Sequence, residues 1–246
     1  MDRHSFTYAQ ELARRLSAFV DKQYIITDPE TQIVYECDGL PAYTQPPLLT
    51  ILPATTKEVQ QIVRLCYKLE VAVVCRGAGT SLSAGAKPYK YGILLSLARF
   101  NMIKKIDTKA RIAIIQPGVT NAAISEAVKE YGLYYAPDPS SQIACSLGGN
   151  VAENAGGVHC LKYGLTVHNV VSLKMVTIEG EIITLGNQGL AHFGPNFLAL
   201  IHGSEGTLGV VTEISVKLLT IPLCTKVMLM AFDDVAQAGD CVSSIM

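Results

Sequence analysis

A short apolar strand, an amphipathic helix and a second apolar strand follow one another between residues 48 and 75. Residues 48–52 are apolar and end at a proline, and Thr55 and Glu58 then have the spacing of a helix N-terminal capping box. The helix predicted from there to about Glu70 carries its apolar side chains on one stripe. Residues 71–75 are the second strand. This order and these lengths predict a βαβ unit, whose two strands run parallel.

The rest of the chain alternates between predicted helices and strands, recognised by their apolar period and by the turn residues between them. The predicted helices are 9–20 and about 121–131, and the predicted strands are 92–97, 111–116, 170–178, 181–185, 207–219 and a segment from 227 that leads into a helix. Strands 170–178 and 181–185 meet at Glu179-Gly180, which is a hairpin signal. A shift in composition near residues 105–110 suggests two subdomains.

Charge and composition exclude several classes of protein. The 246 residues include 20 basic and 21 acidic side chains mixed along the chain, which argues against nucleic acid as the main partner. No apolar run approaches the roughly 18 residues of a membrane-spanning helix, and the polar N-terminus has no signal-peptide region. The seven cysteines include no CxxC pair, which argues against a disulfide framework or a zinc site. We therefore expect a cytoplasmic globular protein without a bound metal.

The first segment that carries chemistry follows the βαβ unit directly. Residues 76–85 read Arg-Gly-Ala-Gly-Thr-Ser-Leu-Ser-Ala-Gly. Ligands of open α/β sheets bind at the carboxyl ends of strands, and glycines let backbone N–H groups converge on an anion. Thr80, Ser81 and Ser83 add hydroxyl donors, and Arg76 adds positive charge. The segment suits a pyrophosphate, although on physics alone a flexible glycine-rich turn explains it about equally well.

Two familiar phosphate motifs are absent from this loop. A dinucleotide fingerprint requires GxGxxG, and Leu82 stands where the third glycine belongs. A Walker loop requires Gly-Lys-Ser/Thr, and Lys87 lies between Ala86 and Pro88. A nucleotide bound by this loop must therefore be held in another way.

Two further segments are rich in glycine and small side chains. Residues 137–157 contain two glycine pairs with many hydroxyl and amide groups, so they fit a flat ligand, a small-residue helix packed closely on a sheet, or both. In residues 203–211 a glycine recurs at every third position before a strand, which alone is a weak signal. The histidines show no metal-binding spacing. His159, which follows the second segment, has the best claim among them to a functional role.

These segments, in this order, resemble a known family. An arginine-glycine loop after a βαβ unit, then PDPSS…GGNVAENAGG, then GSEGTLGVVTE, are similar to the FAD domain of the vanillyl-alcohol oxidase (PCMH-type) superfamily. Within it, the likeness is to the FAD-linked subunits of glycolate oxidase (glycolate dehydrogenase). Residues 138–169 carry most of that likeness, with YECDGL at 35–40 and YYAPDPSS at 134–141 in support. It covers essentially the whole chain.

The resemblance implies an α+β fold of two α/β subdomains with FAD between them. It divides the chain into an N-terminal helix and connector (1–47), a FAD-binding domain (48–224, with subdomains of about 48–106 and 107–224) and the start of a truncated cap domain (225–246). Family members continue into a cap and C-terminal region thought to bind the substrate carboxylate and supply the base. We therefore expect this chain alone to bind flavin without useful turnover, and we name no catalytic residue.

Family analogy also assigns the cofactor-binding residues. The pyrophosphate is assigned to Arg76, Gly77, Ala78, Gly79, Thr80 and Ser81. The flavin and ribityl region is assigned to Ser140, Ser141, Ser146, Gly149, Glu153, Asn154 and Gly156. The adenosine side or flavin edge is assigned to Glu205, Gly206, Val210 and Val211. Relatives that attach flavin covalently through the first loop have a histidine there, and this loop has none, so non-covalent FAD is implied.

The loop departs from the family pattern at two positions. Ser81 and Ala84 stand where glycine is usual. Each would cost on the order of 1 kcal/mol if its φ is positive, because of the added Cβ.

The implied function is oxidation of glycolate, a 2-hydroxy acid, to the 2-oxo acid with hydride transfer to FAD, within glyoxylate metabolism. The implied partners are companion glycolate oxidase subunits, namely a second flavin-domain subunit and an iron-sulfur subunit, or a separate C-terminal half. Any contact with the inner membrane would be peripheral and made through such partners. Three alternatives stay open: a fragment of a D-lactate or D-2-hydroxyglutarate dehydrogenase, a non-catalytic FAD-binding module, and a nucleotide-binding protein without redox chemistry.

Overall fold

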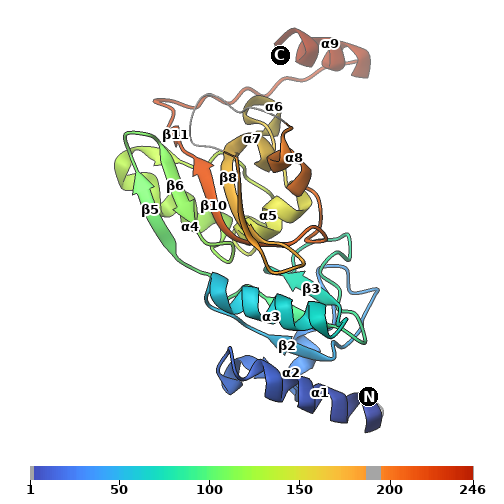
Figure 1. Cartoon of the computed structure of the whole chain (residues 1–246). Coiled ribbons are helices and arrows are strands. Elements are labelled where there is room, and N and C mark those ends of the chain that lie inside the picture. Colours follow the sequence, from blue (N-terminus) through green and yellow to red (C-terminus); the bar gives the residue numbers. More distant parts are fainter. Residues whose placement is uncertain (1–2, 187–194, 246) are drawn as a thin grey trace.

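The computed structural model describes residues 3–186 and 195–245. Two main sheets lie one beyond the other along the molecule, with the N-terminal sheet below and the larger sheet above in the view of Figure 1. Helices pack against both sheets, so the α+β fold implied by the family resemblance is confirmed.

The strands are short, and most helices are short as well. The strands are β1 (Ile25–Ile26), β2 (Leu49–Ile51), β3 (Val73–Arg76), β4 (Ile93–Ser96), β5 (Ile103–Asp107), β6 (Ile112–Ile115), β7 (Leu133–Tyr134), β8 (Val170–Val176), β9 (Ile182–Gly186), β10 (Val210–Lys217) and β11 (Leu219–Thr220). The α-helices are α1 (Arg3–Leu16), α2 (Pro29–Gln32), α3 (Thr56–Lys68), α4 (Asn121–Val128), α5 (Leu147–Glu153), α6 (Cys160–Tyr163), α7 (Thr166–Asn169), α8 (Phe197–Ile201) and α9 (Val235–Ile245). Among the described residues, no helix is both long and apolar enough to cross a membrane.

The predicted strand–helix–strand unit builds the first sheet, whose order is β1-β2-β4-β3. β2 and β3 both pair parallel with β4, so they run parallel to each other, with β4 between them. Helix α3 connects β2 to β3 in the sequence, and it lies across this part of the molecule (Figure 1). The Thr55 hydroxyl accepts the Glu58 N–H at 3.1 Å, which is the predicted N-terminal cap. The predicted stripe of α3, including Val59, Ile62 and Cys66, is buried.

The N-terminal helix begins and ends earlier than the predicted 9–20. After Leu16 the backbone tightens into bonds between residues three apart, such as that from the Phe19 N–H to the Leu16 carbonyl at 2.9 Å. This turn returns the chain to β1, which pairs antiparallel with β2. Leu12, Leu16 and Val20 are nevertheless buried in the core of the first sheet. The sequence therefore revealed the apolar face correctly but not the helix boundaries.

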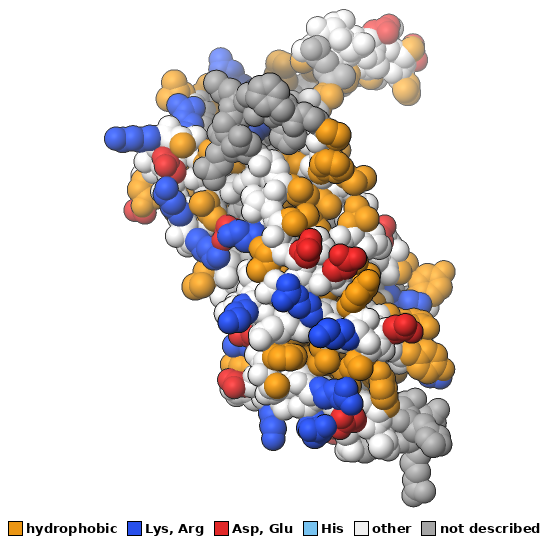
Figure 2. Space-filling view, in the orientation of Figure 1, with side chains coloured by type: hydrophobic (Ala, Val, Ile, Leu, Met, Phe, Trp, Pro, Cys, Tyr) orange, Lys and Arg blue, Asp and Glu red, His pale blue; other side chains and the backbone are white. Residues whose placement is uncertain are grey.

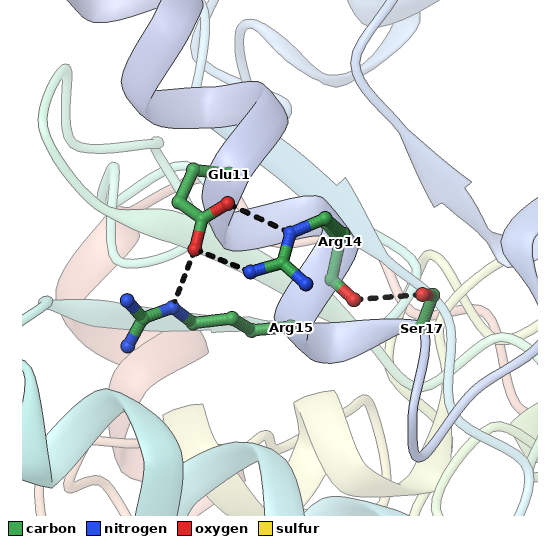
Figure 3. A network of polar contacts seen from close by, with 4 residues as sticks. All are labelled: Glu11, Arg14, Arg15 and Ser17. Carbon is green, nitrogen blue, oxygen red and sulfur yellow. Dashed lines mark hydrogen bonds and ion pairs between the residues drawn. The ribbon is translucent and has the colours of Figure 1, made fainter.

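The exposed face of α1 carries a small network of ion pairs (Figure 3). The Glu11 carboxylate accepts hydrogen bonds from the Arg14 Nε at 2.8 Å and the Arg15 Nε at 2.9 Å. The Ser17 hydroxyl donates to the Arg14 carbonyl at 2.8 Å, just past the end of the helix. Exposed pairs of this kind contribute little to stability. They mark the face of α1 that does not pack on the core.

The larger sheet has the order β5-β6-β10-β8-β9 and is antiparallel throughout. It contains the predicted hairpin, because β8 and β9 are joined at Glu179-Gly180, where Gly180 has a φ of +77°. Glu213 on β10 binds Lys104 of β5 at 2.6 Å and Lys174 of β8 at 3.1 Å. One carboxylate therefore connects three strands of this sheet. Over the face seen in Figure 2, acidic and basic side chains are interleaved.

Elements near the cofactor segments were predicted only in part. α5 lies within residues 137–157, where a small-residue helix was one of the interpretations and no bounds were predicted. The helix predicted over 121–131 is α-helical only to Val128, and a single 3₁₀ turn then leads to Gly132, which has a φ of +68°. β5 also lacks a clear signal, because Lys104 and Lys105 interrupt its apolar pattern.

The strand expected from residue 227 does not form. Residues 221–234 contain no helix or strand, and the side chains of Leu223 and Leu229 are fully exposed at 107% and 100%. A strand needs a neighbour for its backbone hydrogen bonds, and no other described segment pairs with this one. The helix that follows, α9, projects from the end of the molecule farthest from α1 (Figures 1 and 2).

Each sheet has its own hydrophobic core, and the two cores meet. The first is built on β2 and β4 by α1 and α3, and the second lies between the larger sheet, α4 and α5. Val176 at the end of β8 and Val210 at the start of β10 are buried in the first core. In chain order, the last strand of the first sheet ends at Ser96, and the first strand of the larger sheet begins at Ile103. The domain and subdomain limits proposed from the sequence stay predictions.

We expect Leu12→Ala to lower the free energy of unfolding by about 2–5 kcal/mol, because truncation leaves a cavity in a packed core. Leu12 is only 1% exposed. Urea unfolding followed by circular dichroism measures the loss. The matched control is Gln10→Ala on the exposed face of α1, which should stay within about 0.5 kcal/mol of the parent. Equal stability of the two variants would show that α1 does not belong to this core.

Candidate cofactor-binding site

A cavity of about 320 Å³ lies where the two sheets meet. Its walls come from the loop after β3, from α5, and from the loop between α8 and β10. These are the three glycine-rich segments singled out in the sequence. The cavity lies beyond the carboxyl ends of β3 and β4, where open α/β sheets bind ligands. Its volume is at the lower end of small-molecule sites, which span roughly 300–1,000 Å³.

The cavity brings together most of the residues assigned from the sequence. Those in its wall are Arg76, Gly77, Ala78, Gly79, Thr80, Ser81, Ser141, Ser146, Gly149, Glu153, Glu205, Gly206 and Val211. Those outside its wall are Ser140, Asn154, Gly156 and Val210. Wall residues that sequence reasoning missed include Cys75, Leu82, Leu97, Ile201, Ser204 and Gly209. Leu97 follows a parallel strand, so the rule for strand ends could have found it, whereas Ile201 in a short helix carries no such signal.

The loop after β3 is held against the first turn of α5. The Ala78 N–H donates to the Ser146 hydroxyl oxygen at 3.2 Å. The same oxygen accepts the Gly149 N–H at 3.2 Å and so caps α5. A Cβ on Gly77 would overlap this oxygen, so only glycine permits the approach. One hydroxyl therefore joins two of the three cofactor segments.

Two residues of this loop have left-handed backbone. Gly79 has a φ of +70° and Ala84 a φ of +62°. Of the two departures from the family pattern, Ala84 therefore carries the expected strain, while Ser81 does not. The hydroxyls of Ser81 and Ser83 lie 2.6 Å apart, and Ser83 donates to the Glu153 carboxylate at 3.0 Å. The loop is thus also tied to the far end of α5.

The Arg76 guanidinium is engaged by the protein itself. Its Nη1 donates to the Cys37 carbonyl at 2.5 Å, and it lies 5.9 Å from the centroid of the Tyr35 ring. A Cβ on Gly79 would overlap the guanidinium, which therefore sits beneath the turn of the loop. Burial lowers the pKa of Arg76, but an arginine stays charged in a protein.

Buried amides anchor α5. The Asn150 amide donates to the Asn121 side-chain oxygen at 2.9 Å, and the Asn121 amide donates to the Pro137 carbonyl at 2.8 Å. Asn154 ends the helix with a φ of +50°, and its side-chain oxygen accepts the Val167 N–H at 3.1 Å. The fold therefore uses the Asn154 side chain, which explains its absence from the cavity wall. The expectation of a closely packed small-residue helix is confirmed.

The turn after α8 brings backbone onto the end of α5. The Gly203 N–H donates to the Val151 carbonyl at 3.0 Å, and the Glu205 N–H donates to the Ala152 carbonyl at 2.9 Å. Glu205 itself has a φ of +52°. A Cβ on Gly85 would overlap the Glu205 carboxylate, so this turn also touches the first loop. Strained non-glycine backbone of this kind concentrates at functional sites.

The chemistry of the wall fits a dinucleotide such as FAD. Small side chains at Gly77, Ala78 and Gly149 allow close backbone approach, and hydroxyls at Thr80 and Ser141 add neutral donors. The carboxylates in the wall suit ligand hydroxyl and N–H groups, which need acceptors. Within residues 3–186 and 195–245, no group of three or more histidine, cysteine or acidic side chains could hold a metal ion.

His159 does not reach the cavity wall. Its Nδ1 lies 2.6 Å from the Asp138 carboxylate, and its side chain is 65% exposed. The structure therefore gives His159 a partner but no contact with the cavity that the glycine-rich segments form.

Comparisons with known proteins show a FAD-binding domain in this chain. A family model described as a FAD binding domain matches residues 47–186. Glycolate oxidase subunit GlcD of Escherichia coli (strain K12) is 55% identical over 222 residues, which are 90% of this chain and 44% of that protein. GlcD of Bacillus subtilis (strain 168) is 38% identical, over 87% of this chain and 46% of that protein. D-2-hydroxyglutarate dehydrogenase of Xanthomonas citri pv. viticola is 38% identical, over 83% of this chain and 44% of that protein.

Solved structures show the same fold. Alkyldihydroxyacetonephosphate synthase superposes with a TM-score of 0.78 at 27% identity, over 87% of this chain and 41% of that chain. p-Cresol methylhydroxylase superposes with a TM-score of 0.76 at 18% identity, over 91% of this chain and 45% of that chain. The chain spans about half the length of the relatives it matches. Because a FAD-binding model covers most of its length and the fold agrees independently, this chain belongs to the PCMH-type FAD-binding domain family.

Proposed function

We propose that this chain holds FAD non-covalently in the cavity between its two sheets, as the flavin-binding part of an oxidoreductase that converts glycolate to the 2-oxo acid. The observation that carries the proposal is the convergence of three glycine-rich segments on one cavity. The choice of glycolate rests on the 55% identity to a glycolate oxidase subunit, against 38% for the D-2-hydroxyglutarate dehydrogenase.

In this proposal the loop after β3 receives the pyrophosphate. In that role, backbone N–H groups of the turn at Gly79 would hold the phosphates, and Thr80 and Ser81 would add hydroxyls. The flavin and ribityl region is assigned to Ser141, Ser146, Gly149 and Glu153, and the adenosine side to Glu205, Gly206 and Val211. The assigned residues outside the wall keep a supporting role, and they are Ser140, Asn154, Gly156 and Val210.

Bound FAD would accept a hydride from the carbon that bears the substrate hydroxyl. The chain's own contribution is to orient the cofactor and to shield it from water. The links from Ser83 to Glu153 and from Ala78 to Ser146 order the loop through contacts within the protein itself. Pre-ordering of this kind raises affinity, because less motion is lost on binding.

Non-covalent attachment is supported by the weak nucleophilicity of the described side chains in the cavity wall. The described residues of its wall include no histidine, and their one cysteine is Cys75. Burial raises the pKa of the Cys75 thiol to about 12, so little thiolate is present at neutral pH. A thiol in that state is a poor nucleophile toward the flavin ring.

The proposed partners are companion subunits. The relative with 55% identity is named as a subunit of glycolate oxidase. For this chain we propose assembly with a second flavin-domain subunit and an iron-sulfur subunit, or with a polypeptide that supplies the cap. We further propose a cytoplasmic protein of glyoxylate metabolism that meets the inner membrane only through such partners.

Gly79→Val should weaken FAD binding about tenfold or more, because a β-branched residue is strained at this φ and would displace the Arg76 guanidinium. Fluorescence titration of the apoprotein with FAD measures the dissociation constant. Gly132→Val is the matched control, since its φ is +68° and no atom lies within 4 Å of its Cβ position. Ser83→Ala should weaken binding far less. Equal FAD affinities in the Gly79 and Gly132 variants would refute the pyrophosphate role of the loop.

Acid denaturation should release all of the flavin. We expect the yellow colour to stay in the supernatant after acid precipitation and centrifugation, because no covalent bond holds the cofactor. Flavin fluorescence of the washed pellet is the measurement, and a protein with a known covalent flavin is the control. A fluorescent pellet would contradict non-covalent binding while leaving the cavity assignment intact.

Glycolate should reduce the flavin faster than D-lactate or D-2-hydroxyglutarate. The measurement is anaerobic bleaching of the visible flavin absorption in the protein isolated from its source cells with the subunits that co-purify. Faster bleaching by D-lactate or D-2-hydroxyglutarate would overturn the substrate assignment. No bleaching by any 2-hydroxy acid would identify the chain as a non-catalytic flavin module. A purified protein without flavin absorption would support a nucleotide-binding role without redox chemistry.

A further inference from the structure

Residues 35–40, Tyr-Glu-Cys-Asp-Gly-Leu, form a segment that the proposed function does not use. They lie between β1 and β2 in sequence, and none of them belongs to the wall of the cofactor cavity. The segment nevertheless touches the loop after β3 at more than one point. Its position therefore raises the question of what it does for that loop.

The first contact is made by Arg76. Its guanidinium donates to the Cys37 carbonyl at 2.5 Å and faces the Tyr35 ring at 5.9 Å from the centroid. The same guanidinium fills the space beneath Gly79. A side chain held in this way connects residues 35–37 to the turn of the loop. Its positive charge lies under the turn.

The second contact is made by Gly39. A Cβ at this position would lie 2.7 Å from the Ser81 carbonyl oxygen and 2.9 Å from the Thr80 carbonyl oxygen. Both are backbone atoms, which cannot move aside without moving the loop. Gly39 has no positive φ, so glycine is needed here for space alone.

Asp38 shapes the turn that presents Gly39. Its Oδ1 accepts the Leu40 N–H at 2.9 Å, which is the bond of an Asx-turn. Asp38 is only 7% exposed, and its Oδ2 is buried without a hydrogen-bond partner. A buried carboxylate requires a nearby positive charge. The nearest such charge is on Arg76: burial lowers the pKa of its guanidinium, and the charges of Cys37 and Asp38 act in the opposite direction.

We propose that residues 35–40 are a positioning element for the cofactor loop. Gly39 fixes the carbonyl groups of Thr80 and Ser81, and Asp38 folds the turn that carries Gly39. Arg76 is then a positioning residue, which joins this element to the loop instead of acting as a direct ligand of the pyrophosphate. The inference rests on the proposed function, because the loop is taken to receive the pyrophosphate.

The test is FAD binding by the full chain with Gly39→Ala. We expect the dissociation constant for FAD to rise about tenfold or more, since the added methyl group must shift the loop backbone. Riboflavin, which lacks the pyrophosphate, should bind each variant as it binds the parent. The matched control is Gly239→Ala in α9, where no atom lies within 4 Å of the Cβ position. The control should bind FAD as the parent does.

Arg76→Lys keeps the charge but not the planar group that fills the space under Gly79. We expect it to weaken FAD binding in the same way as Gly39→Ala. Because both changes displace one loop, the double variant should lose less affinity than the product of the two single losses. The midpoint of thermal unfolding of each apoprotein serves as a separate measure of the fold.

The outcomes separate this inference from the proposed function. A parent chain that binds no FAD would refute the proposed function itself. A parent that binds FAD, with a Gly39→Ala variant of equal affinity, would refute only the positioning element. Parallel loss of FAD binding, riboflavin binding and thermal stability would also refute it, because that pattern indicates a general defect in folding. If the double variant loses as much FAD affinity as the product of the two single losses, Arg76 acts on the ligand directly and the positioning role is refuted.

Discussion

The contact between Gly77 and the Ser146 hydroxyl is the constraint on which the cofactor site depends. It brings the loop of the first sheet against the first turn of α5, which belongs to the core of the second sheet. The same hydroxyl oxygen accepts N–H groups from both segments, so the position of each is set by the other. Glycine is needed at 77, because any larger residue there would separate the segments. A hydroxyl is needed at 146, because its oxygen accepts both N–H groups.

Around this contact, the cavity is built largely from backbone and neutral groups. The glycine-rich turn after α8 bonds to α5 through main-chain atoms, and α5 is anchored by amides of Asn121 and Asn150. The single arginine of the loop is turned toward residues 35–38. These internal bonds hold the three segments in fixed positions around the cavity.

Much of the fold could be predicted from local pattern. The βαβ unit, its N-terminal cap at Thr55 and the hairpin at Gly180 all follow from short-range rules, and the structure has them. The strand expected from residue 227 is wrong, because an apolar run says nothing about whether a neighbour is present to pair with it. A helix is only one of two interpretations of residues 137–157, because the two glycines and one alanine of α5 weaken the helical period that Leu147 and Val151 carry.

The site was predictable as a set of segments but less well as individual side chains. Glycine spacing pointed to the three segments, and the fold brings them together. Arg76 is predicted as a pyrophosphate ligand because a charged residue opens a glycine-rich loop, and that role stays a prediction for a residue that lies in the cavity wall. Its contact with Cys37 spans 39 positions in sequence, so no local pattern could reveal it. Asn154 likewise has the right chemistry for a ligand, but its left-handed backbone and its bond to Val167 commit it to the fold.

Val176 and Val210 lie on strands β8 and β10 of the larger sheet, but their side chains are buried in the core of the smaller sheet. Pulling the two sheets apart would expose both side chains to water, at a cost of roughly 1.5–3 kcal/mol each. Opening of the two halves around the cavity therefore carries this cost. Since the two cores share these side chains, we expect the two sheets to unfold together as one cooperative unit.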